Sequence, residues 1–385
     1  MQSGHQGKYN MGTNTFAAPA SDIAGQRTKK AHNVGLVGFG FIGEVHLRAI
    51  RAAGSTVQAV SAFSIEEAKA ASEKTGIPRA LSTEELLADK DIDVIHICTP
   101  NIYHAQLAEL AIRNGKHVVC EKPLATSFSD AQRLTQLAEE FGVVATVPFV
   151  YRYYPTIHEA RFQISQSGKS PDLIHGYYLQ DWLASENADN WRVDPKLGGP
   201  SRAFGDIGVH WCDLIEFVSG EMIARVNAQF LKVFQNRGQN KSISTEDGAT
   251  VLFETEKGAK GSFVLSQVSA GRKNKLWFSV EGPQYSYVFD QENPDSLWLG
   301  GIESNQIFIR GNLGESPEAS RYSYLPAGHP QGYQDCFNAF VAETYAAIDG
   351  EEVEGLPRFI DGLRATQLTE AVLRSAEIRD WVETI

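Results

Sequence analysis

A glycine-rich turn near the start of the chain limits its possible folds more than any other feature. Gly38, Gly40 and Gly43 follow a short apolar run, Asn33–Val37, and the next segment, Glu44–Ala53, has the pattern of a helix. In that context Gly38 permits a tight turn, Gly40 lets a ligand approach the backbone, and Gly43 lets the helix pack closely on the strand. The N–H groups at the start of such a helix favour phosphate. The turn therefore predicts a Rossmann fold that binds a dinucleotide.

The part of the chain up to about residue 150 alternates between strand-like and helix-like segments. Beyond the first pair, strands are expected at Thr56–Ala62, Asp93–Cys98, His117–Cys120 and Val143–Val147, and helices at Ile65–Lys74, Thr83–Leu87, Tyr103–Asn114 and Phe128–Phe141. Strands that alternate with helices in this way build a parallel sheet with helices on both faces. We therefore expect a doubly wound, dinucleotide-binding Rossmann domain over residues 31–150.

Residues 151–385 have a different pattern. Alternating or aromatic-rich segments, typical of strands, lie at residues 172–182, 222–235, 248–256, 260–268, 275–281 and 285–290. Turn signals such as Glu281-Gly282-Pro283 separate them, which favours antiparallel pairing. Helices are expected at Pro155–Ser165, Val209–Val218, Tyr333–Ile348 and Asp361–Ile378. The second half is therefore predicted to be an α+β domain for substrate binding and oligomerisation, with a large, open, mostly antiparallel sheet, which makes the whole chain an α/β protein.

The charge balance argues against two classes of partner. The chain carries 35 basic and 47 acidic side chains, a formal charge of −12, so we expect neither nucleic acid nor membrane as a partner. No apolar run approaches the ~20 residues that span a bilayer. The four cysteines form no Cys-x-x-Cys pair, which favours a reduced, cytoplasmic setting. Residues 1–30 are polar and lack the apolar core of a signal peptide, so we expect a disordered extension there, or a true translation start at Met11.

The end of the second strand normally carries the side chain that reads the adenosine ribose. An acidic residue there bonds the 2′-hydroxyl of NAD and repels the 2′-phosphate of NADP. This chain has Ala62, Phe63 and Ser64, with neither an acid nor an arginine, and Ser61 or Ser64 can bond either form. The sequence therefore predicts NAD(H) or NADP(H) as the cofactor and leaves the choice between them open.

Two further segments follow buried strands of the same predicted sheet. Open α/β sheets bind ligands at the carboxyl ends of their strands. Thr99-Pro100-Asn101, with His104, follows one strand, and Glu121-Lys122-Pro123 follows the next. The residues expected to contact the cofactor are Gly38, Phe39, Gly40, Phe41, Ile42, Gly43, Ala62, Phe63, Ser64, Thr99, Pro100, Asn101, His104, Glu121 and Lys122.

Asp206 and His210 lie four residues apart at the start of a predicted helix. If Asp206 caps that helix, both side chains can face one side of its first turn. Histidine, with an ordinary pKa of ~6.5, suits proton transfer near neutrality. Taken singly, however, a plain helix cap and a satisfied buried histidine are the simpler explanations. The segment His210-Trp211-Cys212-Asp213 lacks the spacing of metal ligands, so no metal site is expected.

Five motifs of this chain occur in the order found in a known family. They are the glycine turn with His46, Thr99-Pro100-Asn101 with His104, Glu121-Lys122-Pro123, Tyr151-Arg152-Tyr153-Tyr154-Pro155, and Gly205-Asp206-Ile207-Gly208-Val209-His210. Over roughly residues 33–385 the chain thus resembles the Gfo/Idh/MocA family of sugar and cyclitol dehydrogenases. The resemblance implies that His210 is the acid/base, Lys122 a proton relay and substrate anchor, and Asp206 the orienting carboxylate. A homodimer or homotetramer is expected, because a broad open sheet commonly packs against a second copy.

Candidate substrate contacts come from segments that follow the Rossmann half. Arg152 and Tyr153 lie where the chain crosses between domains, a common place for ligand sites. Two segments that combine aromatic and hydrogen-bonding groups, Gln180-Asp181-Trp182 and Asn190-Trp191-Arg192, suit a sugar. The two tryptophans are explained equally well as core or subunit-contact residues. The candidate substrate contacts are Arg152, Tyr153, Trp182, Trp191, Arg192, Asp206 and His210.

These features together predict an NAD(P)-dependent oxidoreductase. It would transfer hydride between the nicotinamide and a secondary hydroxyl of a sugar, sugar derivative or cyclitol. Two other interpretations stay open: an enzyme that cleaves or epimerises a glycoside through tightly bound NAD in a transient redox cycle, and a cofactor-binding regulator without catalysis. The presence of Lys122, Asp206 and His210 argues against the regulator.

Overall fold

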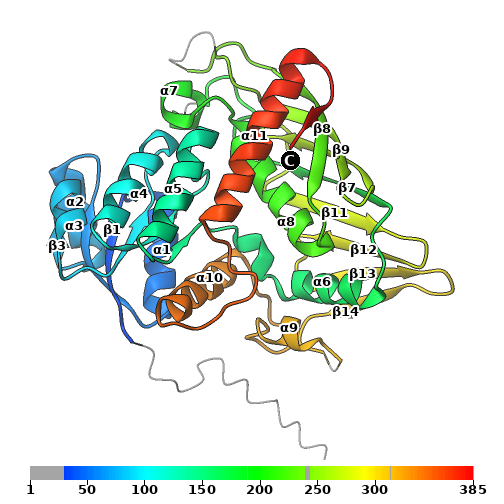
Figure 1. Cartoon of the computed structure of the whole chain (residues 1–385), viewed down its shortest axis with the longest axis horizontal. Coiled ribbons are helices and arrows are strands. Elements are labelled where there is room, and N and C mark those ends of the chain that lie inside the picture. Colours follow the sequence, from blue (N-terminus) through cyan, green and yellow to red (C-terminus); the bar gives the residue numbers. More distant parts are fainter. Residues whose placement is uncertain (1–29, 189, 239–242, 313, 385) are drawn as a thin grey trace, which may run out of the picture.

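The chain folds around two β-sheets that lie side by side, with helices between and beside them (Figure 1). The computed structural model describes residues 30–384 except 189, 239–242 and 313. The extension expected over residues 1–30 therefore lies almost wholly outside the described residues. No helix in the described part is long and apolar enough to cross a membrane.

The first sheet is parallel and six-stranded, in the order β3-β2-β1-β4-β5-β6. Its strands are β1 (Asn33–Val37), β2 (Thr56–Ser61), β3 (Arg79–Ala80), β4 (Val94–Ile97), β5 (His117–Cys120) and β6 (Ala145–Thr146). The elements that connect them are α1 (Phe41–Ala52), α2 (Ile65–Thr75), α3 (Thr83–Ala88), the 3₁₀ turn η1 (Asn101–Tyr103), α4 (His104–Arg113) and α5 (Phe128–Glu140). The doubly wound arrangement predicted from the alternating pattern is confirmed.

Side-chain caps explain where several of these helices begin. Ser64 Oγ accepts the N–H of Glu67 at the start of α2, and Ser127 caps α5 in the same way. Ser82 and Glu85 form a reciprocal capping box at the start of α3. Each cap fixes where a helix leaves the carboxyl edge of the sheet, and that edge is where the candidate site lies.

The second sheet has nine strands in the order β14-β13-β12-β11-β7-β10-β9-β8-β15. They are β7 (Leu173–Leu179), β8 (Ile223–Leu231), β9 (Gly248–Thr255), β10 (Lys260–Ser266), β11 (Lys275–Glu281), β12 (Tyr285–Asp290), β13 (Ser296–Gly301), β14 (Gln306–Ile309) and β15 (Val382–Glu383). All neighbouring pairs are antiparallel except β7 and β10, so the mostly antiparallel sheet is confirmed. The sequence did not predict β13, β14 or β15.

Helices cover one face of this second sheet (Figure 1). The remaining elements are η2 (Val150–Tyr153), α6 (Pro155–Ser167), η3 (Trp191–Val193), α7 (Pro195–Gly198), the π-helical turn η4 (Phe204–Gly208), α8 (Val209–Ser219), α9 (Pro317–Ser320), α10 (Tyr333–Ile348) and α11 (Phe359–Ile378). The other face exposes apolar side chains, with Leu252 48% and Val264 44% accessible. Alternation along the strands thus places one set of side chains in the core and leaves the other set open.

The last two long helices return toward the parallel sheet. Helix α10 packs against α1, and α11 packs against both α5 and β8 (Figure 1). Gln334 at the start of α10 donates to the carbonyl of Val45 in α1. The division near residue 150 therefore stays a prediction, because the C-terminal helices join the two halves into one packed unit.

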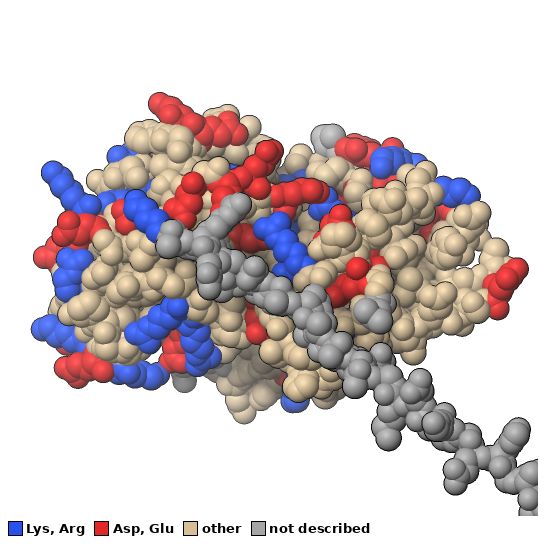
Figure 2. Space-filling view, turned by 90° about the horizontal axis from the view of Figure 1, so that it is seen from below, with Lys and Arg blue, Asp and Glu red and all other residues tan. Residues whose placement is uncertain are grey.

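Acidic and basic side chains are interspersed over the left part of the face seen in Figure 2. The formal charge of −12 is thus not gathered into one block on the visible surface. Such a mixture of signs is the usual surface of a globular protein.

Candidate active site

A cavity of about 1180 Å³ lies between the carboxyl edge of the parallel sheet and the loops of the second half. From the first half it is lined by Val37, Gly38, Phe39, Gly40, Phe41, Ile42, Ala62, Phe63, Glu67, Thr83, Glu84, Leu87, Cys98, Thr99, Pro100, Asn101, Tyr103, His104, Gln106, Leu107, Leu110, Glu121, Lys122 and Pro148. The second half adds Tyr151, Tyr178, Gln180, Asn190, Trp191, Arg192, Leu197, Asp206, Ile207, His210, Asn274 and Tyr333. This volume is large enough for a dinucleotide together with a small polar ligand.

The glycine turn has the geometry that a phosphate cradle needs. Gly38 has φ 88°, and a Cβ there would lie 2.7 Å from the carbonyl oxygen of Cys98. A Cβ on Gly43 would lie 2.8 Å from the carbonyl oxygen of Gly38, so this residue serves helix packing and does not line the cavity. A Cβ on Gly40 would meet no atom within 4 Å, and no side chain caps α1. The backbone at Gly40 is thus open to an anion at the start of the helix.

The end of β2 differs from the sequence interpretation. Ala62 and Phe63 line the cavity, but Ser64 does not, because its hydroxyl caps α2. The buried hydroxyl of Ser61 accepts a hydrogen bond of 3.2 Å from Thr83. Neither serine is therefore placed to hold the ribose as expected.

The loop after β4 joins the two halves at the cavity. Thr99, Pro100 and Asn101 line it, and Asn101 Nδ2 donates to the carbonyl of Gly198 at 2.9 Å. The ring nitrogens of His104 lie 2.7 Å from the carbonyl of Pro123 and 2.9 Å from that of Thr99. His104 thus holds the loops after β4 and β5 together. Burial of its ring lowers its pKa.

Lys122 and Asp206 form the charged centre of the cavity. Lys122 Nζ donates to Asp206 Oδ1 at 2.7 Å and to the Asp206 carbonyl at 3.0 Å. Gln267 Nε2 donates to Asp206 Oδ2 at 2.7 Å, and Arg192 Nε lies 3.4 Å from Oδ1. Burial opposes ionisation of Asp206, but the charges of Lys122 and Arg192 outweigh it and hold the pKa of Asp206 below its ordinary value.

The prediction that Asp206 caps a helix is wrong. Asp206 lies inside the π-helical turn η4, which runs directly into α8, and it makes no capping hydrogen bond. Both of its carboxylate oxygens instead accept hydrogen bonds from side chains that lie far away in the sequence. A π-helical turn of this kind often occurs at a functional site, because it redirects a side chain from the regular helix.

His210 lies in the first turn of α8, beside Asp206, and lines the same cavity. Its ring meets Tyr151 edge-on at 5.1 Å between centroids and Phe149 at 5.7 Å. Burial, with the charge of Lys122, lowers the pKa of His210 to about 3, so the ring is neutral at physiological pH. Its buried Nδ1 has no hydrogen-bond partner in the described part of the chain. A neutral imidazole next to an ammonium group is able to accept a proton.

The packing of α8 on the sheet holds His210 in place. Trp211, the next residue, is fully buried and stacks on Phe263 of β10 at 4.3 Å between ring centroids. Its Nε1 donates to the carbonyl of Trp277 at 3.1 Å. Because neighbouring helix positions point in different directions, Trp211 faces the sheet while His210 faces the cavity.

A buried hydrogen-bond chain ends at Glu121. Tyr345 Oη lies 3.0 Å from His96 Nε2, the Nδ1 atoms of His96 and His46 are 2.8 Å apart, and His46 Nε2 lies 3.1 Å from Glu121 Oε1. Burial disfavours the charge of Glu121, but the hydrogen bond from His46 outweighs it and lowers the pKa of Glu121. Because an ionised carboxylate only accepts, His46 Nε2 donates to Glu121, and Tyr345 lies at the far end of the chain.

Aromatic and amide groups form the wall opposite the glycine turn. The hydroxyl groups of Tyr151 and Tyr178 lie 2.6 Å apart, and Tyr178 Oη donates to Asn274 Oδ1 at 2.8 Å. Gln180 Nε2 donates to the same oxygen at 2.8 Å. Trp182 does not line the cavity, but its Nε1 donates to Gln180 Oε1 at 2.8 Å. Sequence reasoning gave no role to Asn274, which lies just before β11 without any motif around it.

Two other sequence predictions are corrected by the structure. Arg152 does not line the cavity, because its guanidinium is buried and pairs with Asp213 and Asp361. Tyr153 is also buried away from it, with its ring edge-on to Tyr322 at 5.5 Å between centroids. Both residues hold the elements behind the site. Trp191 and Arg192 do line the cavity, as expected.

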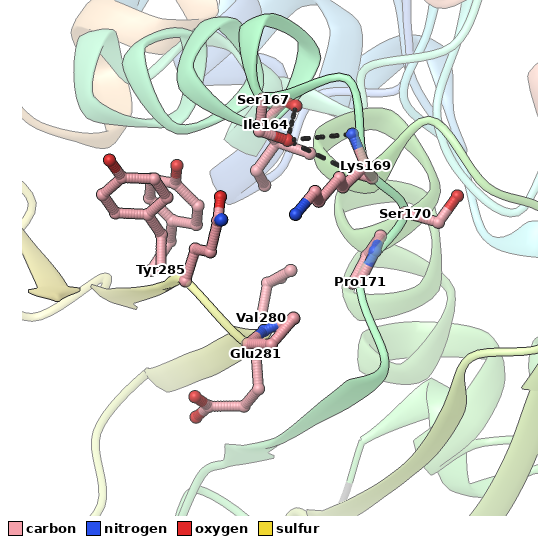
Figure 3. A pocket seen from close by; sticks show the side chains of 12 residues that line it. Ile164, Ser167, Lys169, Ser170, Pro171, Val280, Glu281 and Tyr285 are labelled. Carbon is pink, nitrogen blue, oxygen red and sulfur yellow. Dashed lines mark hydrogen bonds between the residues drawn. The ribbon is translucent and has the colours of Figure 1, made fainter. Parts of the chain in front are cut away.

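Within the described residues, no three His, Cys, Asp or Glu side chains are grouped as metal ligands. A second hollow, shown in Figure 3, lies between the end of α6 and the turn from β11 to β12, where Ile164, Pro171 and Val280 line it. Its volume of about 30 Å³ is too small for a nucleotide or a sugar.

Comparisons with known proteins assign the class and then the family. A Rossmann sheet joined to a mostly antiparallel sheet, with Lys122, Asp206 and His210 between them, defines a two-domain oxidoreductase. Residues 32–149 match the family model described as an oxidoreductase family with an NAD-binding Rossmann fold. Residues 170–288 match the GFO/IDH/MocA C-terminal domain. The chain belongs to the Gfo/Idh/MocA family of oxidoreductases, as the resemblance indicated.

Several relatives are similar along most of the chain. Levoglucosan dehydrogenase of Pseudarthrobacter phenanthrenivorans is 28% identical in an alignment 393 positions long, which covers 91% of this chain and 97% of that protein. A structure of levoglucosan dehydrogenase in complex with NADH and levoglucosan is 28% identical, with a TM-score of 0.86 over 92% of this chain and 100% of that one. An inositol dehydrogenase homolog from Azotobacter vinelandii, complexed with NAD⁺, is 25% identical, with a TM-score of 0.84 over 93% and 98%.

Proposed function

We propose that this protein is a dehydrogenase that oxidises a secondary hydroxyl of a sugar, sugar derivative or cyclitol, in a reversible reaction with a nicotinamide cofactor. One observation carries the proposal: a neutral imidazole, an ammonium group and a carboxylate, from His210, Lys122 and Asp206, meet in one cavity. The open backbone at Gly40 and the uncapped start of α1 fit the cofactor's pyrophosphate. When bound, the cofactor supplies the hydride acceptor.

Each of the three groups has one task in this proposal. His210 accepts the hydroxyl proton, because its ring is uncharged and faces the cavity. Lys122 donates a hydrogen bond to the substrate oxygen and stabilises the negative charge that develops on it. Asp206 orients Lys122 through the 2.7 Å hydrogen bond.

The wall opposite the glycine turn supports a polyhydroxylated substrate. Tyr151, Tyr178, Gln180 and Asn274 bring hydroxyl and amide groups to the cavity, and Trp191 adds an aromatic face. Buried polar networks of this kind hold their members in fixed orientations, which suits recognition of several hydroxyl groups at once. The names of the relatives, levoglucosan dehydrogenase and inositol dehydrogenase homolog, support a sugar or cyclitol of similar size.

A substrate screen tests this proposal. The purified protein is incubated with sugars, anhydrosugars and cyclitols together with NAD or NADP, and the absorbance of the reduced cofactor is followed. We expect net reduction with at least one of them, and no such turnover in His210→Ala. Tight, non-exchanging NAD without net reduction on any substrate would overturn the proposal and favour a transient redox cycle. A protein that binds cofactor and turns over nothing would be a regulator.

We also propose a homodimer or homotetramer in the cytoplasm. The uncovered face of the second sheet exposes Leu252, Val264 and Trp298, which suits contact with a second copy. All four cysteines, Cys98, Cys120, Cys212 and Cys336, are free and buried, which suits a reducing compartment. Light scattering of the purified protein measures the oligomeric state, and a monomer at all concentrations would contradict the first of these two proposals.

A further inference from the structure

We propose that Glu67 and Glu84 make this enzyme select NAD(H) over NADP(H), because both carboxylates face the place of the adenosine ribose. The inference deepens the proposed function and rests on it in one respect: the cavity along the glycine turn must hold a nicotinamide dinucleotide. It does not depend on which substrate the other end of the cavity accepts.

The position of the ribose follows from the fold. In a Rossmann domain the pyrophosphate lies at the first helix, and the adenosine ribose lies at the end of the second strand. In this chain that strand is β2, and the residues after it that line the cavity are Ala62 and Phe63. Neither side chain can bond or repel a group on the ribose 2′-oxygen. Selection between the two cofactors must therefore come from neighbouring elements.

Two neighbouring helices bring carboxylates to this place. Glu67 lies in the first turn of α2 and Glu84 in the first turn of α3, and both line the cavity. Hydrogen bonds tie both turns to the end of β2: Ser64 accepts the Glu67 N–H at 3.2 Å, and Thr83 donates to Ser61 at 3.2 Å. The starts of both helices, and with them Glu67 and Glu84, thus lie next to the end of β2 along the same cavity.

The charges around the cavity are separated along its length. Its basic lining residues in the described part of the chain are Lys122 and Arg192, and both lie against Asp206 at the other end. Within the same residues, neither Glu67 nor Glu84 forms an ion pair. A 2′-phosphate at the end of β2 would therefore face two carboxylates and no cation, whereas a 2′-hydroxyl can donate a hydrogen bond to either carboxylate.

Binding measurements test this inference directly. The full-length protein is titrated with NADH and with NADPH at low ionic strength, and the change in fluorescence gives both dissociation constants. We expect NADH to bind more tightly by on the order of tenfold or more. The double variant Glu67→Gln with Glu84→Gln keeps the size of both side chains, and we expect it to reduce that ratio severalfold, mainly through tighter binding of NADPH.

A matched control lies one position away. Glu66 is exposed, occupies the same helix turn and does not line the cavity, so Glu66→Gln removes an equal charge and leaves the ratio unchanged. Equal affinities for the two cofactors in the unmodified protein, or the same ratio in the double variant, would overturn the inference. If neither cofactor binds, the proposed function fails as well. If both bind equally and a sugar is still oxidised, only the selection by Glu67 and Glu84 fails.

Discussion

The two ends of the cavity are built in opposite ways. At the end near His210, every charged group is held: Asp206 accepts from Lys122 and Gln267, and the tyrosine and amide wall is hydrogen-bonded through Asn274. At the adenosine end the lining side chains extend into solvent, with Phe63 92% and Phe41 79% accessible. Preorganised groups stabilise a transition state, whereas a binding surface needs only complementary shape and charge. The contrast predicts that catalysis and cofactor affinity can be changed separately in this protein.

We expect the largest effect when the charge of Lys122 at the reacting end is removed. Lys122→Ala should lower kcat/KM by about a thousandfold or more, about 4 kcal/mol, because the substrate oxygen loses its donor and Asp206 loses its partner. Steady-state kinetics on an accepted sugar measures this. The dissociation constant of NADH should change much less, since the pyrophosphate and adenosine contacts are elsewhere.

An exposed lysine supplies the control for that variant. Lys196 is exposed in the short helix α7 and does not line the cavity, so Lys196→Ala should leave kcat/KM unchanged. Activity of Lys122→Ala equal to that of the unmodified enzyme on every accepted substrate would break the proposed division of labour. A parallel loss of NADH affinity and kcat would show instead that the two ends are coupled.

Sequence patterns predicted most of what local chemistry determines. The glycine turn and the strand at His117–Cys120 both lie where their residues indicated. The strands that were missed lie toward the edges of the second sheet. One of them, Ser296–Gly301, ends in two glycines, so its pairing with β12 and β14 makes it a strand.

Residues of the site that depend on distant partners could not be predicted in the same way. Arg152 lies in a motif that suggested a substrate contact. Its partners Asp213 and Asp361, however, come from α8 and α11, far along the chain. Asp206 has a common capping pattern, and only Lys122 and Gln267 show why it lies in a π-helical turn. In the sequence, Glu67 and Glu84 look like ordinary acidic residues in the first turn of a helix, where the helix dipole stabilises a negative charge. Their place on the cavity appears only in three dimensions.

Two buried histidines have similarly lowered pKa values but lie in different surroundings. Burial lowers the pKa of both His210 and His158 to about 3, but only His210 lines the cavity. His158 stacks on Tyr322 at 4.3 Å between ring centroids. For each, the unfolded chain binds a proton below pH ~6.5 and the folded protein does not until about pH 3, so stability falls as pH drops through that window.

The variant His158→Phe tests this assignment. It removes one titrating group and a buried Nε2 without a partner in the described part of the chain. The loss of unfolding free energy between pH 7 and pH 5 should shrink by roughly 1–2 kcal/mol, measured by urea denaturation at both values. The pH dependence of kcat should stay unchanged. An unaltered stability profile would contradict the buried, neutral state of His158.

At the adenosine end we expect a substitution to have the opposite pattern to Lys122→Ala, with weaker cofactor binding and unchanged kcat. Phe63 lines the cavity with 92% of its surface accessible, and an aromatic ring there can stack on adenine. Phe63→Ala should weaken NADH about tenfold, the usual contribution of one stacked base, with kcat unchanged at saturating cofactor. Phe141 is exposed at the end of α5 and does not line the cavity, so Phe141→Ala serves as the control. A fall in kcat with unaltered affinity would reverse the assignment of the two ends.

The smallest effect is expected behind the reacting end. Tyr345→Phe removes the hydroxyl at the far end of the chain that ends at Glu121 and leaves the packing intact, so we expect a two- to fivefold fall in kcat, about 1 kcal/mol or less. Losing the hydroxyl removes the contact with His96 Nε2 and weakens the chain that supports the Glu121 carboxylate, so the pKa of Glu121 should rise. The acid limb of the pH profile of kcat should therefore move toward neutrality. A purely structural tyrosine would lower the melting temperature and leave that limb in place, so the pH profile decides between the two roles.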